Sequence, residues 1–227
     1  MNTMDYAGVR VDLEADILTD PVRQALRYGD YEREETECVE LYLEEDDDVL
    51  ELGGGIGYLA CYVDQRLADD RTHVVVEPNG HLLGVLERHR ELNDATFETL
   101  NAAYAAEGDI LELSIPETFW EASLGDRPSG DASLYTCGVD LETLFEAFDL
   151  SEAVLIVDIE GSEVDLIENE LGVLRSHCRL LIVEYHYDDV PVELAEDVRM
   201  AKGRLDTSAF ELIDEKESVS VYRSTDL

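Results

Sequence analysis

A glycine-rich segment in the first quarter of the chain has the residue types and spacing of a ligand-binding loop. Residues 49–60 read VLELGGGIGYLA, in which an apolar run leads through glycines into a helical pattern. We predict a strand over 49–52, then a tight turn, then a helix whose first N–H groups face a ligand. Such a turn lets the backbone approach a cofactor closely. The glycines of this loop are Gly53, Gly54, Gly55 and Gly57.

An acidic residue follows this loop at the distance typical of ribose binding. The next apolar run, residues 73–77, ends in Glu77. In nucleotide-binding α/β proteins, a carboxylate about 20 residues after the glycine turn accepts hydrogen bonds from ribose hydroxyls. Glycines alone would indicate only a tight turn, but the complete order of strand, turn, helix, strand and acid predicts a site for an adenosine-containing cofactor.

The acid two residues before the glycines helps to choose between two cofactors. Residues 55–60 fit the pattern GxGxxA, so an NAD-dependent oxidoreductase is an alternative. Glu51, however, would direct a negative charge toward the pyrophosphate of a dinucleotide. The ammonium group at the methionine end of S-adenosylmethionine would instead be attracted to this carboxylate. We therefore favour S-adenosylmethionine as the cofactor.

A second group of polar residues ends two later apolar runs. Asp158 and Glu160 end one run, and Glu184 and His186 end the next. Ligands of open α/β sheets bind beyond the carboxyl ends of the strands, so we expect these side chains to face the transferable methyl group. Methyl transfer from a sulfonium needs an aligned nucleophile and removal of its proton. Asp158 and His186 are the candidate bases.

Other roles are open to the same residues. Asp158 and Glu160 could cap the helix that we expect near Ser162, and His186 could be an ordinary loop histidine. Asp158, Glu160 and Glu184 together could also bind Mg²⁺ through oxygen atoms, which hard cations prefer. The interpretation adopted from the sequence uses the four side chains for catalysis and assigns no metal to the site.

The elements that must position these residues alternate along the chain. Predicted strands lie at 49–52, 73–77, 96–103, 154–160 and 180–186. Predicted helices lie at 57–68, 80–93, 162–176 and 192–205. Residues 209–223 are typical of two strands joined by a polar turn. This order predicts an α/β, Rossmann-like fold with a mostly parallel sheet, helices on both faces and an antiparallel pair at one edge.

Two stretches depart from the alternation. Residues 1–47 have helical patterns around 22–29 and 35–45, which predicts a helical N-terminal extension before a catalytic core at 48–227. Residues 104–150 hold a polar segment with prolines and glycines, flanked by possible strands. We find no internal repeat and no linker, so we expect one domain over the whole chain.

The net charge is the most unusual bulk property. The chain has 55 acidic and 16 basic residues, a formal charge of −39. Such a field repels phosphates and anionic membranes, so we expect a small-molecule or glycan acceptor, with neither nucleic acid nor membrane as a partner. Acidic residues spread over the whole chain indicate adaptation to high salt. The absence of a signal-peptide pattern and of CxxC pairs predicts a cytoplasmic, reducing location.

The chain resembles the FkbM-type family of S-adenosylmethionine-dependent methyltransferases. The likeness runs from about Tyr31 to His186. It rests on YEREET, the glycine segment, VEPN, LNAA, DIEGSE and VEYH. The resemblance implies a seven-stranded sheet with one antiparallel strand, and methyl transfer to a hydroxyl, often on a sugar.

The resemblance also implies roles for individual residues. Glu51 and the glycines would flank the methionine end of the cofactor, Glu77 would bind the ribose, and Asn101 and Ala102 would lie near the adenine. The chain departs from the family at position 55, where asparagine is usual, and at Val157, where lysine is usual. The second departure leaves open a relative that binds the cofactor without catalysis.

Overall fold

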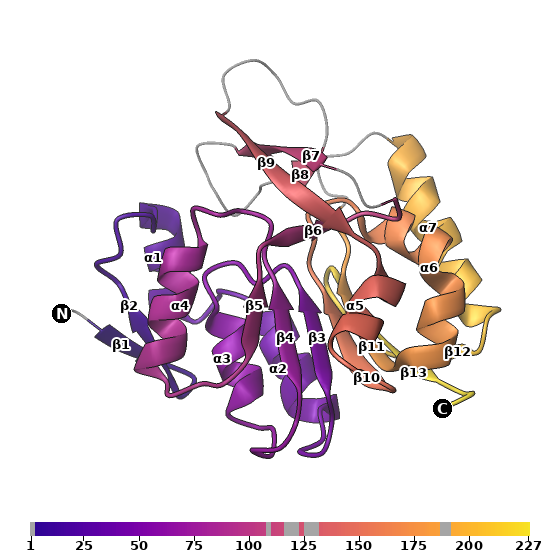
Figure 1. The fold of residues 1–227 in the computed structure, drawn as a ribbon, viewed down its shortest axis with the longest axis horizontal. Helices are drawn as coiled ribbons and strands as arrows, with labels where there is room; N and C mark the ends of the chain where they lie inside the picture. The colour runs from indigo at the N-terminus through magenta and orange to yellow at the C-terminus, as the bar shows by residue number, and fades with distance from the viewer. Residues whose placement is uncertain (1–2, 108–109, 116–122, 125–131, 187–191) are drawn as a thin grey trace.

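A seven-stranded sheet forms the centre of the fold (Figure 1). The computed structural model describes residues 3–107, 110–115, 123–124, 132–186 and 192–227. The strand order is β12–β13–β11–β10–β3–β4–β5. These strands are β3 (Val49–Leu52), β4 (His73–Val76), β5 (Glu98–Leu100), β10 (Ala153–Val157), β11 (Cys178–Glu184), β12 (Phe210–Lys216) and β13 (Val219–Ser224).

The predicted sheet type is confirmed. The five strands from β11 to β5 pair in parallel, and β13 is antiparallel to both β11 and β12. Every residue of β3 and β4 is buried, as expected for parallel strands covered on both faces. The closing pair, β12 and β13, lies at one edge of the sheet as predicted. Of the two, β13 pairs with β11 and β12 is the outermost strand.

Helices cover both faces of this sheet, and strand periodicity decides which residues meet which helices. Val49, Val75 and Ile156 pack in one cluster with the first four helices. Leu50 and Leu155, which point the other way, pack with the last three. The first set is α1 (Asp20–Tyr28), α2 (Arg33–Tyr42), α3 (Tyr58–Asp64) and α4 (Leu83–Leu92). The second set is α5 (Leu141–Ala147), α6 (Glu163–His177) and α7 (Val192–Asp206).

The N-terminal extension is not wholly helical, which corrects the expectation for residues 1–47. A hairpin of β1 (Thr3–Tyr6) and β2 (Val9–Asp12) precedes α1 and α2. Its two turn residues, Ala7 and Gly8, both have positive φ, at 48° and 89°. A two-residue turn of this kind matches the twist of the strands that it joins. The alternating valines of β2 are fully buried, so this hairpin belongs to the core.

A buried histidine fastens the hairpin to the glycine loop. His89 of α4 has no exposed surface. The backbone N–H of Asp12 donates to its Nε2 at 3.0 Å, and its Nδ1 lies 2.8 Å from the carbonyl oxygen of Ile56. Because Nε2 accepts a hydrogen bond, Nδ1 carries the proton and donates to Ile56. Burial lowers the pKa of His89, which favours this neutral form.

A smaller four-stranded sheet lies above the large one in Figure 1. Its order is β6 (Ala102–Tyr104), β9 (Ala132–Val139), β7 (Ile110–Ile115), β8 (Ser123–Leu124). The single strand expected over 96–103 is therefore divided, with β5 in the large sheet and β6 in the small one. The prolines and glycines expected to form a polar segment, at 116, 125, 128 and 130, lie outside the described residues. Within the described ranges, no helix is both long and apolar enough to cross a bilayer.

Candidate active site

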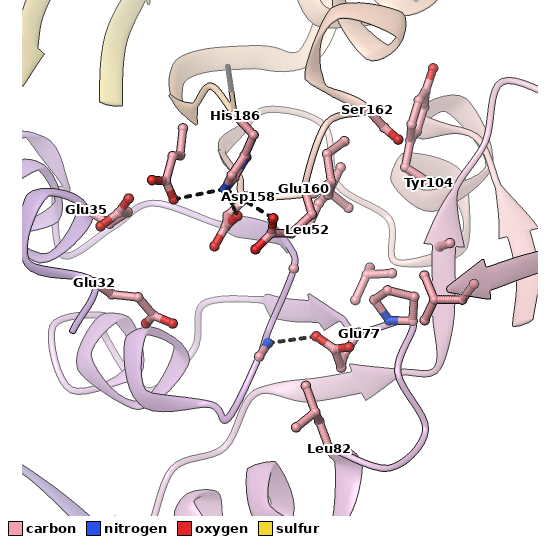
Figure 2. A pocket seen from close by; sticks show the side chains of 18 of the residues that line it. Glu32, Glu35, Leu52, Glu77, Leu82, Tyr104, Asp158, Glu160, Ser162 and His186 are labelled. Carbon is pink, nitrogen blue, oxygen red and sulfur yellow. Dashed lines mark hydrogen bonds and ion pairs between the residues drawn. The ribbon is translucent and has the colours of Figure 1, made fainter. Parts of the chain in front are cut away.

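A cavity of about 390 Å³ opens at the carboxyl ends of the central strands. The glycine loop, the ends of β4, β10 and β11, the start of α2 and the small sheet all contribute to its wall (Figure 2). Eight of the residues proposed from the sequence line it. They are Gly53, Gly55, Glu77, Ala102, Asp158, Glu160, Glu184 and His186.

Gly53 is needed because the backbone after β10 lies against the loop. Its φ is +96°, and a Cβ atom built on it would lie 1.7 Å from the carbonyl oxygen of Asp158. The N–H of Asp158 in turn donates to the carbonyl oxygen of Leu52 at 2.9 Å. The loop and the first candidate catalytic residue are thus held together by backbone contacts alone.

Gly55 is the glycine that faces open space in the cavity. A Cβ atom at this position would meet only the Tyr31 hydroxyl, at 3.5 Å, and Glu32 Oε1, at 3.6 Å. Its N–H donates to Glu77 Oε2 at 2.7 Å. The loop is therefore tied to the acid that follows β4, and the side of Gly55 toward the cavity is left open for a ligand.

Glu77 is a buried carboxylate with both oxygens already in hydrogen bonds. Its side chain is 4% exposed, and Oε1 accepts the N–H of Asn79 at 2.6 Å. Burial raises the pKa of Glu77 to about 7, although the N–H groups of Asn79 and Gly55 oppose this shift. Each carboxylate oxygen has a second lone pair, so Glu77 can also accept hydrogen bonds from a ligand hydroxyl.

Glu51 is not among the residues that line the described cavity, and its expected place beside the cofactor stays a prediction. It is 1% exposed and lies on the sheet face that packs against α1–α4, with its Oε2 3.4 Å from His73 Nε2. Alternate residues of a strand face opposite sides, so Glu51 shares the face of Val49, whereas its neighbour Leu52 lines the cavity. Burial lowers the pKa of His73, but the neighbouring carboxylates of Asp64 and Glu51 outweigh this effect and raise it.

Three other residues proposed for the cofactor have structural roles in the described chain. The Asn101 amide donates to the carbonyl oxygens of Glu77, at 2.8 Å, and Pro78, at 3.1 Å, and so fixes the segment after β4. Gly54 lies against Val75, and Gly57 begins α3 against Leu86. Gly54 and Gly57 thus shape the glycine loop and Asn101 holds the segment after β4, and none of the three is in the described cavity wall.

Four carboxylates surround the single imidazole of the cavity, as Figure 2 shows in part. His186 Nε2 lies 3.5 Å from Asp158 Oδ1, 3.6 Å from Glu160 Oε2 and 3.7 Å from Glu184 Oε2. His186 Nδ1 lies 3.0 Å from Oε1 of Glu163, which is 2% exposed. The ends of β10 and β11 therefore bring together all four residues proposed for catalysis.

The charges of this cluster decide which group can accept a proton. Burial opposes protonation of His186, but Glu163, Asp158 and Glu160 outweigh it and raise the pKa of the imidazole to about 10. Burial and the charge of Glu184 hold the pKa of Asp158 well above its usual range. His186 is therefore protonated at neutral pH when no other cation is present, and in that form it cannot act as a base. Asp158, whose raised pKa makes it a better proton acceptor than an ordinary aspartate, is the candidate base that remains.

Sequence reasoning missed the acids that lie at the start of α2. Glu32 and Glu35 line the cavity, and Glu35 is only 4% exposed. Burial and the charge of Glu51 raise the pKa of Glu32 to about 8. Burial and Glu184 raise the pKa of Glu35 well above its usual range. The motif YEREET contained both residues, but nothing in its spacing indicated that it packs against β11.

No protein-family model matches the chain, and no curated protein matches it either. Among solved structures, a provisionally named rRNA methylase from Clostridium thermocellum aligns with 84% of this chain and 93% of its own, at 8% identity and a TM-score of 0.54. An rRNA methylase from Streptococcus thermophilus aligns over 85% and 95%, at 9% identity and a TM-score of 0.51. The chain has the Rossmann-like fold of these methyltransferases.

The structural neighbours correct one expectation. Net charge was taken to exclude nucleic acid as a partner, and that exclusion is wrong, because proteins of this fold are named as rRNA methylases. The error has a physical origin. Net charge sums over the whole chain, whereas binding depends on the local surface and on the salt that screens it.

Proposed function

We propose that this chain is an S-adenosylmethionine-dependent methyltransferase that acts on a hydroxyl group. The observation that carries the proposal is the pairing of Gly55 with Glu77 on one side of a cavity whose other side holds the carboxylates around His186. The first pair suits the ribose and the loop-bound part of the cofactor. The second group suits an acceptor that must lose a proton.

The charge of the cavity favours this cofactor over a dinucleotide. The described lining contains eight acidic side chains and neither lysine nor arginine. A bound sulfonium or ammonium favours the ionised form of these acids and is stabilised by it, whereas a pyrophosphate is repelled. Glu32, close to Gly55, takes the role that Glu51 was expected to have at the methionine end.

In the proposed reaction the acceptor oxygen attacks the methyl carbon and the carbon–sulfur bond breaks. S-adenosylhomocysteine leaves as the neutral thioether, and the hydroxyl proton passes to Asp158. The raised pKa of Asp158 makes it the better acceptor for that proton. His186, which the sequence also offered as a base, instead supplies positive charge beside Asp158.

The resemblance to FkbM-type enzymes supports a sugar hydroxyl as the acceptor. Of its two departures from the family pattern, Gly55 preserves the loop, and Val157 is 1% exposed within the core cluster on the α5–α7 side. Val157 does not contribute to the described cavity wall. This departure therefore gives no reason to prefer a relative without catalysis.

Calorimetry in molar KCl tests the cofactor. S-adenosylhomocysteine should bind with a stoichiometry of one and NADH should not bind. Saturable NADH binding without S-adenosylhomocysteine binding would establish the oxidoreductase alternative. The same titration with Glu77→Ala should show weaker binding by about 10-fold to 100-fold, since a hydrogen bond to a charged group contributes about 1.5–3 kcal/mol.

A labelled-methyl assay tests the acceptor and the base. The panel should contain glycans, small alcohols and RNA, because a ribose hydroxyl is also a sugar hydroxyl. With any acceptor found, Asp158→Asn should lower kcat by about 100-fold or more and leave the affinity for S-adenosylhomocysteine nearly unchanged. Loss of cofactor binding with unchanged kcat would place Asp158 in the cofactor site instead.

A further inference from the structure

We propose that Asp158, Glu160 and His186 bind one divalent transition-metal ion at the edge of the cavity. One ligand atom from each of these side chains lies within 4.8 Å of the other two. The three come from the segments that follow β10 and β11, so neighbouring parallel strands hold them in place. This site differs from the all-carboxylate Mg²⁺ site that the sequence allowed.

The separations within the cluster suit coordination better than direct hydrogen bonding. Nε2 of His186 lies 3.5 Å from Asp158 Oδ1 and 3.6 Å from Glu160 Oε2. A direct N–H···O hydrogen bond is shorter, at about 2.7–3.2 Å. Two atoms bound to one ion at about 2.1–2.2 Å, and at a tetrahedral angle, lie about 3.4–3.6 Å apart. An ion placed between these atoms would need only small side-chain movements.

The orientation of the imidazole is fixed from outside the cluster. Nδ1 donates to Glu163 Oε1 at 3.0 Å, and that oxygen also accepts the N–H of Gly161 at 3.0 Å. Glu163 is 2% exposed and cannot turn away. Metal-binding histidines usually donate their second N–H to such a carboxylate, which leaves the other nitrogen for the metal. Here that nitrogen is Nε2, and it faces the two carboxylates.

A second observation, separate from the three ligands, also indicates a cation. Glu35 of α2 is 4% exposed and lines the same cavity, and the group that faces it is the carboxyl of Glu184. Asp158 Oδ1 is buried without a hydrogen-bond donor in the described structure. Buried carboxylates that face one another are costly unless a cation lies nearby. The described cavity wall offers these acids neither lysine nor arginine; its one cationic side chain is His186, whose Nε2 proton a bound ion would displace while supplying a larger positive charge in the same place.

The donor atoms select the class of ion. An imidazole nitrogen with carboxylate oxygens suits Mn²⁺, Fe²⁺ or Zn²⁺ better than Mg²⁺, which prefers oxygen alone. At this position the ion would contact the acceptor and favour loss of its hydroxyl proton. That catalytic role rests on the proposed function, whereas metal binding itself does not.

Pulsed electron paramagnetic resonance with Mn²⁺ tests the site in the wild-type protein without cofactor. Molar KCl should suppress weak binding to the acidic surface. We expect one saturable Mn²⁺ per chain, with modulation of its signal by a directly bound imidazole nitrogen. Saturable binding without nitrogen modulation would overturn the histidine ligand, and the absence of saturable binding would overturn the site.

Matched variants localise the ion. His186→Gln and Glu160→Gln should each weaken Mn²⁺ binding by at least about 10-fold, and Glu163→Gln by about 10-fold to 100-fold. Glu34→Gln removes the same charge from the cavity wall outside the cluster and should leave Mn²⁺ affinity unchanged. Equal affinity in all four variants would contradict the proposal. S-adenosylhomocysteine binding, measured separately, shows whether the proposed function fails independently of the metal site.

Discussion

The carbonyl oxygen of Asp158 occupies the space that a side chain at Gly53 would need. The contact, at 1.7 Å from the position of a Cβ atom, joins the glycine loop to the residue after β10. A glycine that would be assigned to cofactor binding from its motif alone is thus required for the approach of two backbone segments. Gly55, two residues further, faces the cavity.

Because Gly53 is enclosed and Gly55 faces the cavity, alanine should impair folding at the first position and ligand binding at the second. Gly53→Ala should lower Tm strongly or prevent folding, because backbone on both sides must move. Gly55→Ala adopts a φ of +50°, which costs about 1–2 kcal/mol, and should remain folded but bind S-adenosylhomocysteine more weakly. Circular dichroism and calorimetry in molar KCl measure the two effects. Wild-type stability of Gly53→Ala would show that the loop and β10 do not meet as described.

Cofactor affinity should depend on pH through Glu77. Its pKa is raised to about 7 by burial, and a ligand hydroxyl that donates to the carboxylate favours the ionised form. Binding therefore releases a proton, so the affinity for S-adenosylhomocysteine should rise as pH increases toward about 7 and level off above it. Calorimetry from pH 5.5 to 8.5 measures this trend. Glu77→Gln should flatten it, and an unchanged slope in that variant would assign the titration to another group.

Stability should fall as pH rises, in part because of Glu32. Burial and Glu51 raise its pKa to about 8, so between about 4.5 and 8 the folded protein binds the proton more tightly than the unfolded chain. The favourable contribution is complete below that range and is lost across it. Tm measured with a chelator present should decrease from pH 5 to 8, and less steeply in Glu32→Gln. A surface change such as Glu211→Gln is the control, and an equal slope in both variants would contradict the assignment.

Salt should stabilise the protein over a wide range. A charge of −39 on 227 residues opposes the compact state, and raising KCl from 0.1 M to 1 M shortens the screening length from about 10 Å to about 3 Å. Thermal unfolding should move to higher temperature across that range. A constant Tm would count against adaptation to high salt.

The spacing of apolar residues predicted the strands and helices of the large sheet because each of them is specified by a short stretch of sequence. Residues 49–52 form β3 as expected, and the rule that parallel strands end at one edge brought Asp158 and His186 together. The hairpin at Ala7 and Gly8 also had a local signal, a two-residue turn followed by alternating valines, but helical patterns elsewhere in the extension drew the interpretation away from it.

Other features depend on contacts that no local pattern contains. The position of Glu51 before the glycines suggested contact with the cofactor. The alternation of side chains along a strand does not by itself say which of them line the cavity. Glu35 lines the cavity beside Glu184, although far more than one hundred residues separate them in the chain. Only the packing of α2 on β11 creates that pair, and with it much of the electrostatics of the site.

The buried imidazole of His89 has a consequence for ligand affinity. Its bonds to Asp12 and Ile56 restrain the glycine loop through an element that precedes the whole sheet in sequence. The conformational entropy of the loop is therefore lost when the chain folds and need not be lost again when a ligand arrives. Preorganisation of this kind strengthens binding without adding a contact to the ligand. The hairpin at residues 3–12, which does not itself line the described cavity, thus contributes to affinity by reducing the disorder of the unliganded state.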